Sequence, residues 1–165
     1  GGDWGKRLGK DNVINRGISG DVAMGIYDRL HQILPGKPKQ IFLLIGVNDI
    51  SHDLSTDSIV NMIEKNVTRI QRESPETKLY LQSLLPIDES FNRYKKLTNK
   101  TYQIPEINDR LKALAKEKKI DFIDLYPLFT EKGTNVLRKE LTYDGLHLKE
   151  EGYKIWVDAI KKKMK

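Results

Sequence analysis

The chain has 165 residues, of which 38% are hydrophobic and 32% are charged, with a formal net charge of +6. This balance predicts one folded domain over residues 1–165 and excludes an intrinsically disordered chain. The absence of cysteine excludes disulfides, thiolate metal sites and a cysteine nucleophile, and it leaves the cellular compartment open. No run reaches the roughly 20 apolar residues of a membrane span.

Strands and helices are predicted to alternate through the first half of the chain. Residues 12–15 form a short strand candidate, and a helix begins at Asp21 and ends at Pro35. The continuous apolar run over residues 41–45 predicts a strand that is buried on both faces. Ser55 or Thr56 then caps a helix with an apolar stripe at helical spacing, made of Ile59, Ile63, Val67 and Ile70.

The second half of the chain continues this alternation. Residues 79–83 and 121–124 are predicted strands, and a polar loop over residues 88–100 leads into the helix between them. Residues 149–163 predict a closing helix, whose end carries the lysines of the basic tail. Regular strand–helix alternation implies a parallel sheet with helices on both faces. Neither a linker nor an internal repeat divides the chain.

Polar residues follow two of the predicted strands, at the sheet edge where such folds bind ligands. Gly20 stands at a helix start, where a glycine presents an unobstructed backbone N–H to an anion. Asn48 offers uncharged side-chain N–H groups. Two neutral donors that converge on one point form an oxyanion hole for acyl transfer. Taken separately, Gly20 fits a simple turn glycine and Asn48-Asp49 fits a loop and helix cap.

The segment Asp144-Gly145-Leu146-His147 places a carboxylate three residues before the only histidine in the second half of the chain. A neutral imidazole acts as a general base near pH 7, and a nearby carboxylate fixes its tautomer and stabilises the imidazolium. The alternative for Asp144-Gly145 is an ordinary turn. Together with Gly20 and Asn48, in this order and at strand ends, the pattern is far more specific than any one of its parts.

The chain resembles the SGNH hydrolases, also called GDSL-type lipases or acylhydrolases. Residues 15–21 match the second family block, residues 46–49 the third and residues 144–147 the fifth. The resemblance implies a flavodoxin-like, three-layer α/β/α fold and ester hydrolysis without a metal or an organic cofactor. By position it implies that Gly20 and Asn48 are oxyanion donors, that His147 is the base and that Asp144 orients it.

The first family block, a buried strand that ends in Gly-Asp-Ser and supplies the nucleophilic serine, has no match in this sequence. Ser19 is the nearest substitute, but its context is Gly-x-Ser-Gly rather than Gly-x-Ser-x-Gly. We therefore expect the serine upstream of Gly1, on a strand that lies between residues 12–15 and residues 41–45. On this expectation the domain is N-terminally incomplete, and the chain as written lacks its nucleophile.

The expected substrate is a small-molecule ester with a small acyl group, acetyl first, on a sugar or another polar alcohol. The alternatives are a lysophospholipase-like lipid acylhydrolase and a non-catalytic binding domain that has lost the nucleophile. The loop with Phe91, Arg93, Tyr94 and Tyr102 is the candidate pocket wall. No nucleic-acid motif accompanies the lysines, and no phosphate-binding glycine motif supports a nucleotide binder. The sequence leaves the oligomeric state open.

Overall fold

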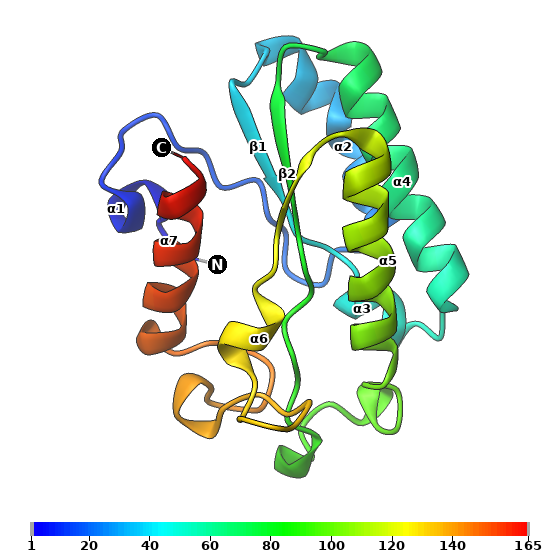
Figure 1. Cartoon of the computed structure of the whole chain (residues 1–165), viewed down its shortest axis with the longest axis vertical. Helices are drawn as coiled ribbons and strands as arrows, with labels where there is room; N and C mark the ends of the chain where they lie inside the picture. The colour runs from blue at the N-terminus through cyan, green and yellow to red at the C-terminus, as the bar shows by residue number, and fades with distance from the viewer. Residues whose placement is uncertain (1, 165) are drawn as a thin grey trace.

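The computed structural model describes residues 2–164, and a parallel sheet lies at its centre (Figure 1). Its strands are β1 (Gln40–Leu43), β2 (Lys78–Gln82) and β3 (Asp121–Ile123), in the order β1-β2-β3. Both pairs are parallel, with Phe42 opposite Tyr80 and Leu81 opposite Phe122. Parallel neighbours need long crossover connections, and the helices between the strands provide them.

Helices cover both faces of the sheet and complete the predicted three-layer α/β/α arrangement. In Figure 1, α2 (Ala23–Ile33), α4 (Thr56–Glu73) and α5 (Gln103–Lys118) lie on one side of the strands, and α1 (Trp4–Leu8) and α7 (Glu150–Lys163) lie on the other. The short helices α3 (Val47–Ser51) and α6 (Tyr126–Phe129) follow β1 and β3. The 3-10 turns are η1 (Leu34–Gly36), η2 (Glu89–Phe91), η3 (Lys95–Leu97) and η4 (Lys139–Leu141). Within residues 2–164, no helix combines the length and apolarity needed to cross a bilayer.

Helix α4 forms as its sequence predicts. The Ser55 hydroxyl accepts a hydrogen bond from the Ser58 backbone N–H at 3.1 Å, which satisfies one of the free donors of the first turn. The predicted apolar stripe is fully buried against the sheet and the neighbouring helices; it consists of Ile59, Ile63, Val67 and Ile70. Of the two predicted caps, Ser55 and Thr56, the structure therefore uses Ser55.

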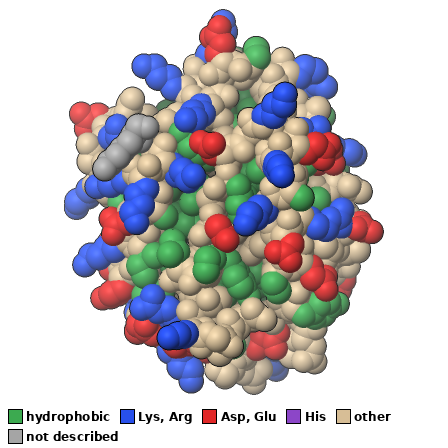
Figure 2. Space-filling view, in the orientation of Figure 1, with side chains coloured by type: hydrophobic (Ala, Val, Ile, Leu, Met, Phe, Trp, Pro, Cys, Tyr) green, Lys and Arg blue, Asp and Glu red, His purple; other side chains and the backbone are tan. Residues whose placement is uncertain are grey.

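Strand β1 differs from the prediction that it is buried on both faces. Only Leu43 is buried, and the other three residues of the strand are half-buried. The reason is its position: within residues 2–164, β1 pairs with β2 alone, so its outer edge has no neighbouring strand. Figure 2 shows hydrophobic side chains at the surface on the face that lies between α7 and β1 in Figure 1. Towards β2, the Phe42 ring stacks on the ring of Tyr80, with centroids 4.4 Å apart.

The prediction of a strand over residues 12–15 is wrong for this structure. The segment has no regular secondary structure, and the Ile14 side chain is 70% exposed. A strand is defined by its ladder of hydrogen bonds, and no described segment offers this one a partner. Upstream of this segment lies α1. Asp3 caps its start, where the carboxylate accepts the backbone N–H of Lys6 at 2.9 Å. Trp4 then packs edge-on against Trp156 of α7.

Candidate active site

The turn at residues 144–147 is organised by the two oxygens of one carboxylate. Asp144 Oδ1 accepts the backbone N–H groups of Leu146 at 3.0 Å and His147 at 2.8 Å. Its other oxygen, Oδ2, lies 2.8 Å from Nδ1 of the His147 ring. The same side chain therefore fixes both the backbone and the imidazole of His147. The network assigns the ring proton to Nδ1, which leaves Nε2 as the basic nitrogen.

Gly145 is required by the way this turn packs. Its backbone has φ +87°, and a Cβ atom built there would lie 2.3 Å from the carbonyl oxygen of Asp88. In return, the Gly145 carbonyl accepts the Asp88 backbone N–H at 2.9 Å. The loop that begins at Asp88 is thus bonded directly to the turn that holds His147, and only a glycine lets the two backbones come this close.

Tyr94 reaches the Asp144–His147 pair from that loop. Its hydroxyl lies 2.5 Å from Asp144 Oδ2 and 2.9 Å from His147 Nδ1. The sequence marked Tyr94 only as a candidate pocket wall and gave no sign of this contact. Its partners are 50 and 53 residues further along the chain, and the fold of residues 88–97 alone brings them together.

These contacts keep Asp144 ionised. Partial burial, the largest single influence, raises the pKa of the Asp144 carboxyl. The hydrogen bonds from Tyr94, from the His147 ring and from the two backbone N–H groups together outweigh it, so this pKa lies well below its ordinary value. The hydrogen bond to Asp144 and the loss of water contact raise the pKa of the Tyr94 hydroxyl. The pair is therefore a carboxylate and a neutral phenol at physiological pH.

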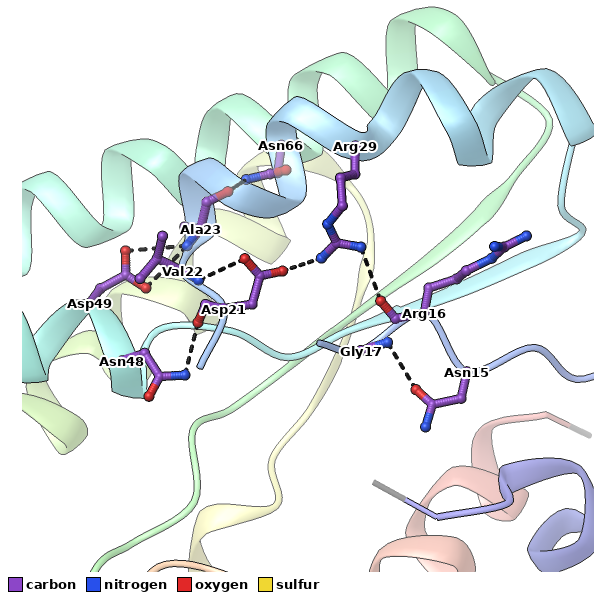
Figure 3. Close-up of polar contacts among 10 residues, drawn as sticks. All are labelled: Asn15, Arg16, Gly17, Asp21, Val22, Ala23, Arg29, Asn48, Asp49 and Asn66. Carbon is purple, nitrogen blue, oxygen red and sulfur yellow. Dashed lines mark hydrogen bonds and ion pairs between the residues drawn. The ribbon is translucent and has the colours of Figure 1, made fainter. Parts of the chain in front are cut away.

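The two predicted oxyanion donors, Gly20 and Asn48, make up the second half of the candidate site and lie on the loop before α2 and on α3. One Asn48 Nδ2 hydrogen is donated to the Asp21 carbonyl at 2.9 Å (Figure 3). This bond holds the Asn48 amide beside Asp21, the residue after Gly20. The second hydrogen of the Asn48 amide remains available. Gly20 has φ +77°, and nothing lies within 4 Å of where a Cβ would be. Within residues 2–164 its N–H has no acceptor.

Asp49 joins α3 to the start of α2 next to these two residues. Its carboxylate is 1% exposed and accepts the Ala23 backbone N–H, with its two oxygens at 3.1 and 3.3 Å (Figure 3). Desolvation raises the pKa of Asp49 despite this hydrogen bond. Asn66 of α4 completes the junction by donating to the Ala23 carbonyl at 3.0 Å. The interpretation of Asn48-Asp49 as a cap is thus correct for Asp49, but the helix that it caps is α2.

The two halves lie at the same end of the molecule. Helix α3, which carries Asn48, packs against η3, the turn that directly follows Tyr94. Asp53, just after α3, and Lys100, just after η3, form an ion pair. In Figure 1, α3 and the loops on either side of α6 lie at one end of the strands. No hydrogen bond joins His147 to Gly20 or Asn48 among the described side chains.

The serines of the described chain are engaged elsewhere or exposed. Ser51 donates to the Asn48 carbonyl at 2.7 Å, and Ser83 is buried with its hydroxyl accepting the N–H groups of Leu125 and Tyr126. Ser19 lies exposed in the loop before α2. Within residues 2–164, no serine hydroxyl is hydrogen-bonded to His147. No group of three His, Cys, Asp or Glu side chains in this range is arranged to hold a metal ion.

A family model described as "GDSL-like Lipase/Acylhydrolase family" matches residues 1–155. Among curated proteins, the chain is 25% identical over 158 residues to N-acylneuraminate cytidylyltransferase of Escherichia coli O18:K1:H7. This match covers 94% of the chain and 36% of that protein, so the chain spans about a third of the length of its curated relative.

Two solved structures show the fold. A GDSL-like lipase from Bacteroides thetaiotaomicron superimposes with a TM-score of 0.86 at 24% identity, over 96% of this chain and 78% of that one. The acetyl xylan esterase AlAXEase does so with a TM-score of 0.75 at 22% identity, over 90% of this chain and 79% of that one. At these identities the likeness concerns the architecture.

Proposed function

The chain belongs to the GDSL-like lipase/acylhydrolase family, and from this premise we propose that it is the hydrolytic domain of a serine esterase. The substrate we propose is a small acyl ester, acetyl first, of a sugar or another polar alcohol. The observation that carries the proposal is the bond between Asp144 Oδ2 and His147 Nδ1. It leaves Nε2 of a ring that is 65% exposed free to take a proton.

In the proposed reaction, His147 removes the proton of a serine hydroxyl as that hydroxyl attacks the ester carbonyl. The Gly20 N–H and the free Asn48 amide hydrogen hold the oxyanion of the tetrahedral intermediate. His147 then protonates the departing alcohol, and a water molecule repeats the sequence on the acyl-enzyme. Asp144 remains ionised throughout and stabilises the imidazolium.

The nucleophile in this proposal is a serine outside the 165 residues, on a strand that pairs with the outer edge of β1. Two observations favour this place. The outer edge of β1 has no partner within residues 2–164, and three of its four side chains are only half-buried. Backbone N–H and C=O groups in a sheet are normally paired, so this edge suits an added strand.

One observation favours a sugar as the alcohol, and a second favours an anionic substrate. The curated relative is named for N-acylneuraminate, which is an acidic, acylated sugar. The chain carries a net charge of +6, and Arg93 lines the same small pocket as Tyr94 and Asp144. A positive potential around a site raises the local concentration of an anionic substrate.

Labelling with a fluorophosphonate probe tests the esterase proposal. The probe is applied to the chain alone and to a version extended upstream of Gly1 by a strand that ends in Gly-Asp-Ser. We expect only the extended protein to label, and we expect His147→Ala to abolish labelling. His31→Ala is the matched control, because His31 is exposed on α2. Labelling that survives His147→Ala contradicts the proposed base.

Hydrolysis of p-nitrophenyl esters by the extended protein tests the acyl group. We expect the acetyl ester to have a higher kcat/KM than the octanoyl and palmitoyl esters. A preference for the long chains favours the lipid acylhydrolase instead. Release of acetate from O-acetylated neutral and acidic sugars then compares the two kinds of alcohol. Failure to label or to hydrolyse any of these esters favours a binding domain.

A further inference from the structure

Three polar atoms meet at the back of the His147 ring, where the family's motif places two. Asp144 Oδ2, His147 Nδ1 and the Tyr94 hydroxyl oxygen lie 2.5, 2.8 and 2.9 Å from one another, so each contacts the other two. We propose that Tyr94 is a positioning residue of the general base: it holds Asp144 and shields the Nδ1–H of His147 from water. This inference rests on the proposed function for its role in catalysis, and on geometry alone for the contact.

Counting protons fixes the roles within the triangle. The ring N–H at Nδ1 and the Tyr94 hydroxyl each supply one proton, and both face Asp144 Oδ2, which has lone pairs to accept them. With its own proton directed at the carboxylate, the Tyr94 oxygen turns a lone pair towards Nδ1. The Nδ1–H therefore has two acceptors, one charged and one neutral. An N–H···O⁻ or O–H···O⁻ contact is roughly twice as strong as a neutral hydrogen bond.

Exposure shows why a third group is useful here. The His147 side chain is 65% exposed, whereas that of Asp144 is 18% exposed. Water competes for any carboxylate oxygen that it can reach, and Tyr94 occupies the position on Oδ2 that water would otherwise take. The Tyr94 ring and the imidazole also pack edge to face, with centroids 5.7 Å apart and planes at 61°.

The loop that carries Tyr94 is itself fixed to the turn that carries His147. The backbone bond from Asp88 to Gly145 ties the start of the loop to the turn, and the Asp88 carboxylate caps η2 by accepting the Ser90 N–H at 2.9 Å. Besides Asp144 itself, Asp88, Glu89 and Arg93 line the same small pocket as Tyr94. The charge of Arg93 lowers the Tyr94 pKa against the larger influences that raise it. The hydrogen bonds made by Asp88 fix the start of the loop that carries Tyr94.

Proton NMR of the full chain tests the proposal without requiring activity. We expect the wild type to show a downfield Nδ1–H resonance from His147 that exchanges slowly with water, and ¹⁵N shifts of the Nδ1–H tautomer. Tyr94→Phe should speed the exchange at least tenfold or broaden the resonance beyond detection. Tyr143→Phe is the matched control, since this neighbour of Asp144 has a 68% exposed side chain, and it should leave the exchange unchanged.

The ¹⁵N shifts of the His147 ring show whether Tyr94 acts through Asp144. In an Asp144→Asn background, Tyr94→Phe should change these shifts much less than in the wild type, because the shared acceptor is already gone. A wild type with no slowly exchanging Nδ1–H overturns the proposal, as does a Tyr94→Phe protein that exchanges like the wild type. Either result stands whether or not the protein hydrolyses esters.

In the extended, serine-bearing protein, the expected kinetic effect of Tyr94→Phe is a fall in kcat of about ten- to a hundredfold with KM nearly unchanged. A change confined to KM would make Tyr94 part of the substrate pocket instead. Fluorophosphonate labelling of that protein tests the proposed function. If the extended protein with Tyr94 unchanged does not label at all, the esterase proposal fails, but the NMR test of Tyr94 is unaffected.

Discussion

The Asp88 backbone N–H donates a hydrogen bond of 2.9 Å to the carbonyl of Gly145, although the two residues are 57 positions apart in the sequence. Through this bond the loop with Tyr94 and the turn with His147 behave as one unit. The approach leaves no room for a side chain at Gly145, and its φ of +87° disfavours any residue but glycine.

Gly145→Ala is therefore expected to destabilise the protein more than Gly133→Ala. Both glycines have positive φ, at +87° and +75°, but a Cβ at Gly133 meets nothing within 4 Å. The Gly133 variant should lose about 1 kcal/mol from backbone strain alone, and the Gly145 variant should lose more than about 2 kcal/mol because two backbones must also separate. Urea denaturation measures the difference, and equal losses would contradict the close packing described for Gly145.

Asp144→Asn should change the pH dependence of stability. The pKa of Asp144 is lower in the folded protein than in the unfolded chain, so its contribution is present above the unfolded pKa of about 3.9 and is lost as pH falls through the folded value. We expect the wild type to be more stable than Asp144→Asn at pH 7, and the gap to narrow on acidification. Urea midpoints at pH 7, 5 and 3 test this; a gap that stays constant contradicts it.

Asp49→Ala should cost about 1–3 kcal/mol of stability, because it leaves the buried N–H of Ala23 without an acceptor at the start of α2. Asp57→Ala is the control, because the Asp57 side chain is 82% exposed in its ion pair with Arg110 and should matter little. Thermal and urea denaturation compare the two variants. A larger loss for Asp57→Ala would show that Asp49 does not support α2 as described.

Asn48→Ala should lower the kcat of the extended, serine-bearing protein by about 10²- to 10³-fold with little change in KM, because an oxyanion donor acts mainly in the transition state. Asn61→Ala, at an exposed position on α4, is the matched control. Steady-state kinetics with p-nitrophenyl acetate give both constants. An unchanged kcat would remove Asn48 from the proposed oxyanion hole.

Local patterns in the sequence are enough to predict much of the fold. The stripe from Ile59 to Ile70 needs only helical periodicity, and Ser55 needs only its place ahead of that stripe. The contact between Asp144 and His147 is similarly local, since only two residues of a tight turn lie between them. Such features depend on neighbours along the chain, and the structure contains them as expected.

Other features depend on segments that meet only in the folded molecule. The position of Tyr94 follows from the path of residues 88–97, and nothing near Tyr94 in the sequence indicates its partners. The half-burial of β1 follows from the lack of a described strand on its outer edge. Residues 12–15 likewise have no described strand to pair with. An apolar run shows that a strand is suited to burial, but the arrangement of its neighbours decides how deeply it is buried.

The outer side of β1 also bears on how the protein behaves in concentrated solution. Within residues 2–164 no strand pairs with the amide and carbonyl groups of this edge, so in the 165-residue chain without the proposed strand they are a template on which an extended peptide can add, including the same edge of another copy. Self-association that grows with concentration, and that is suppressed by a proline or lysine introduced along β1, is the physical signature of that template.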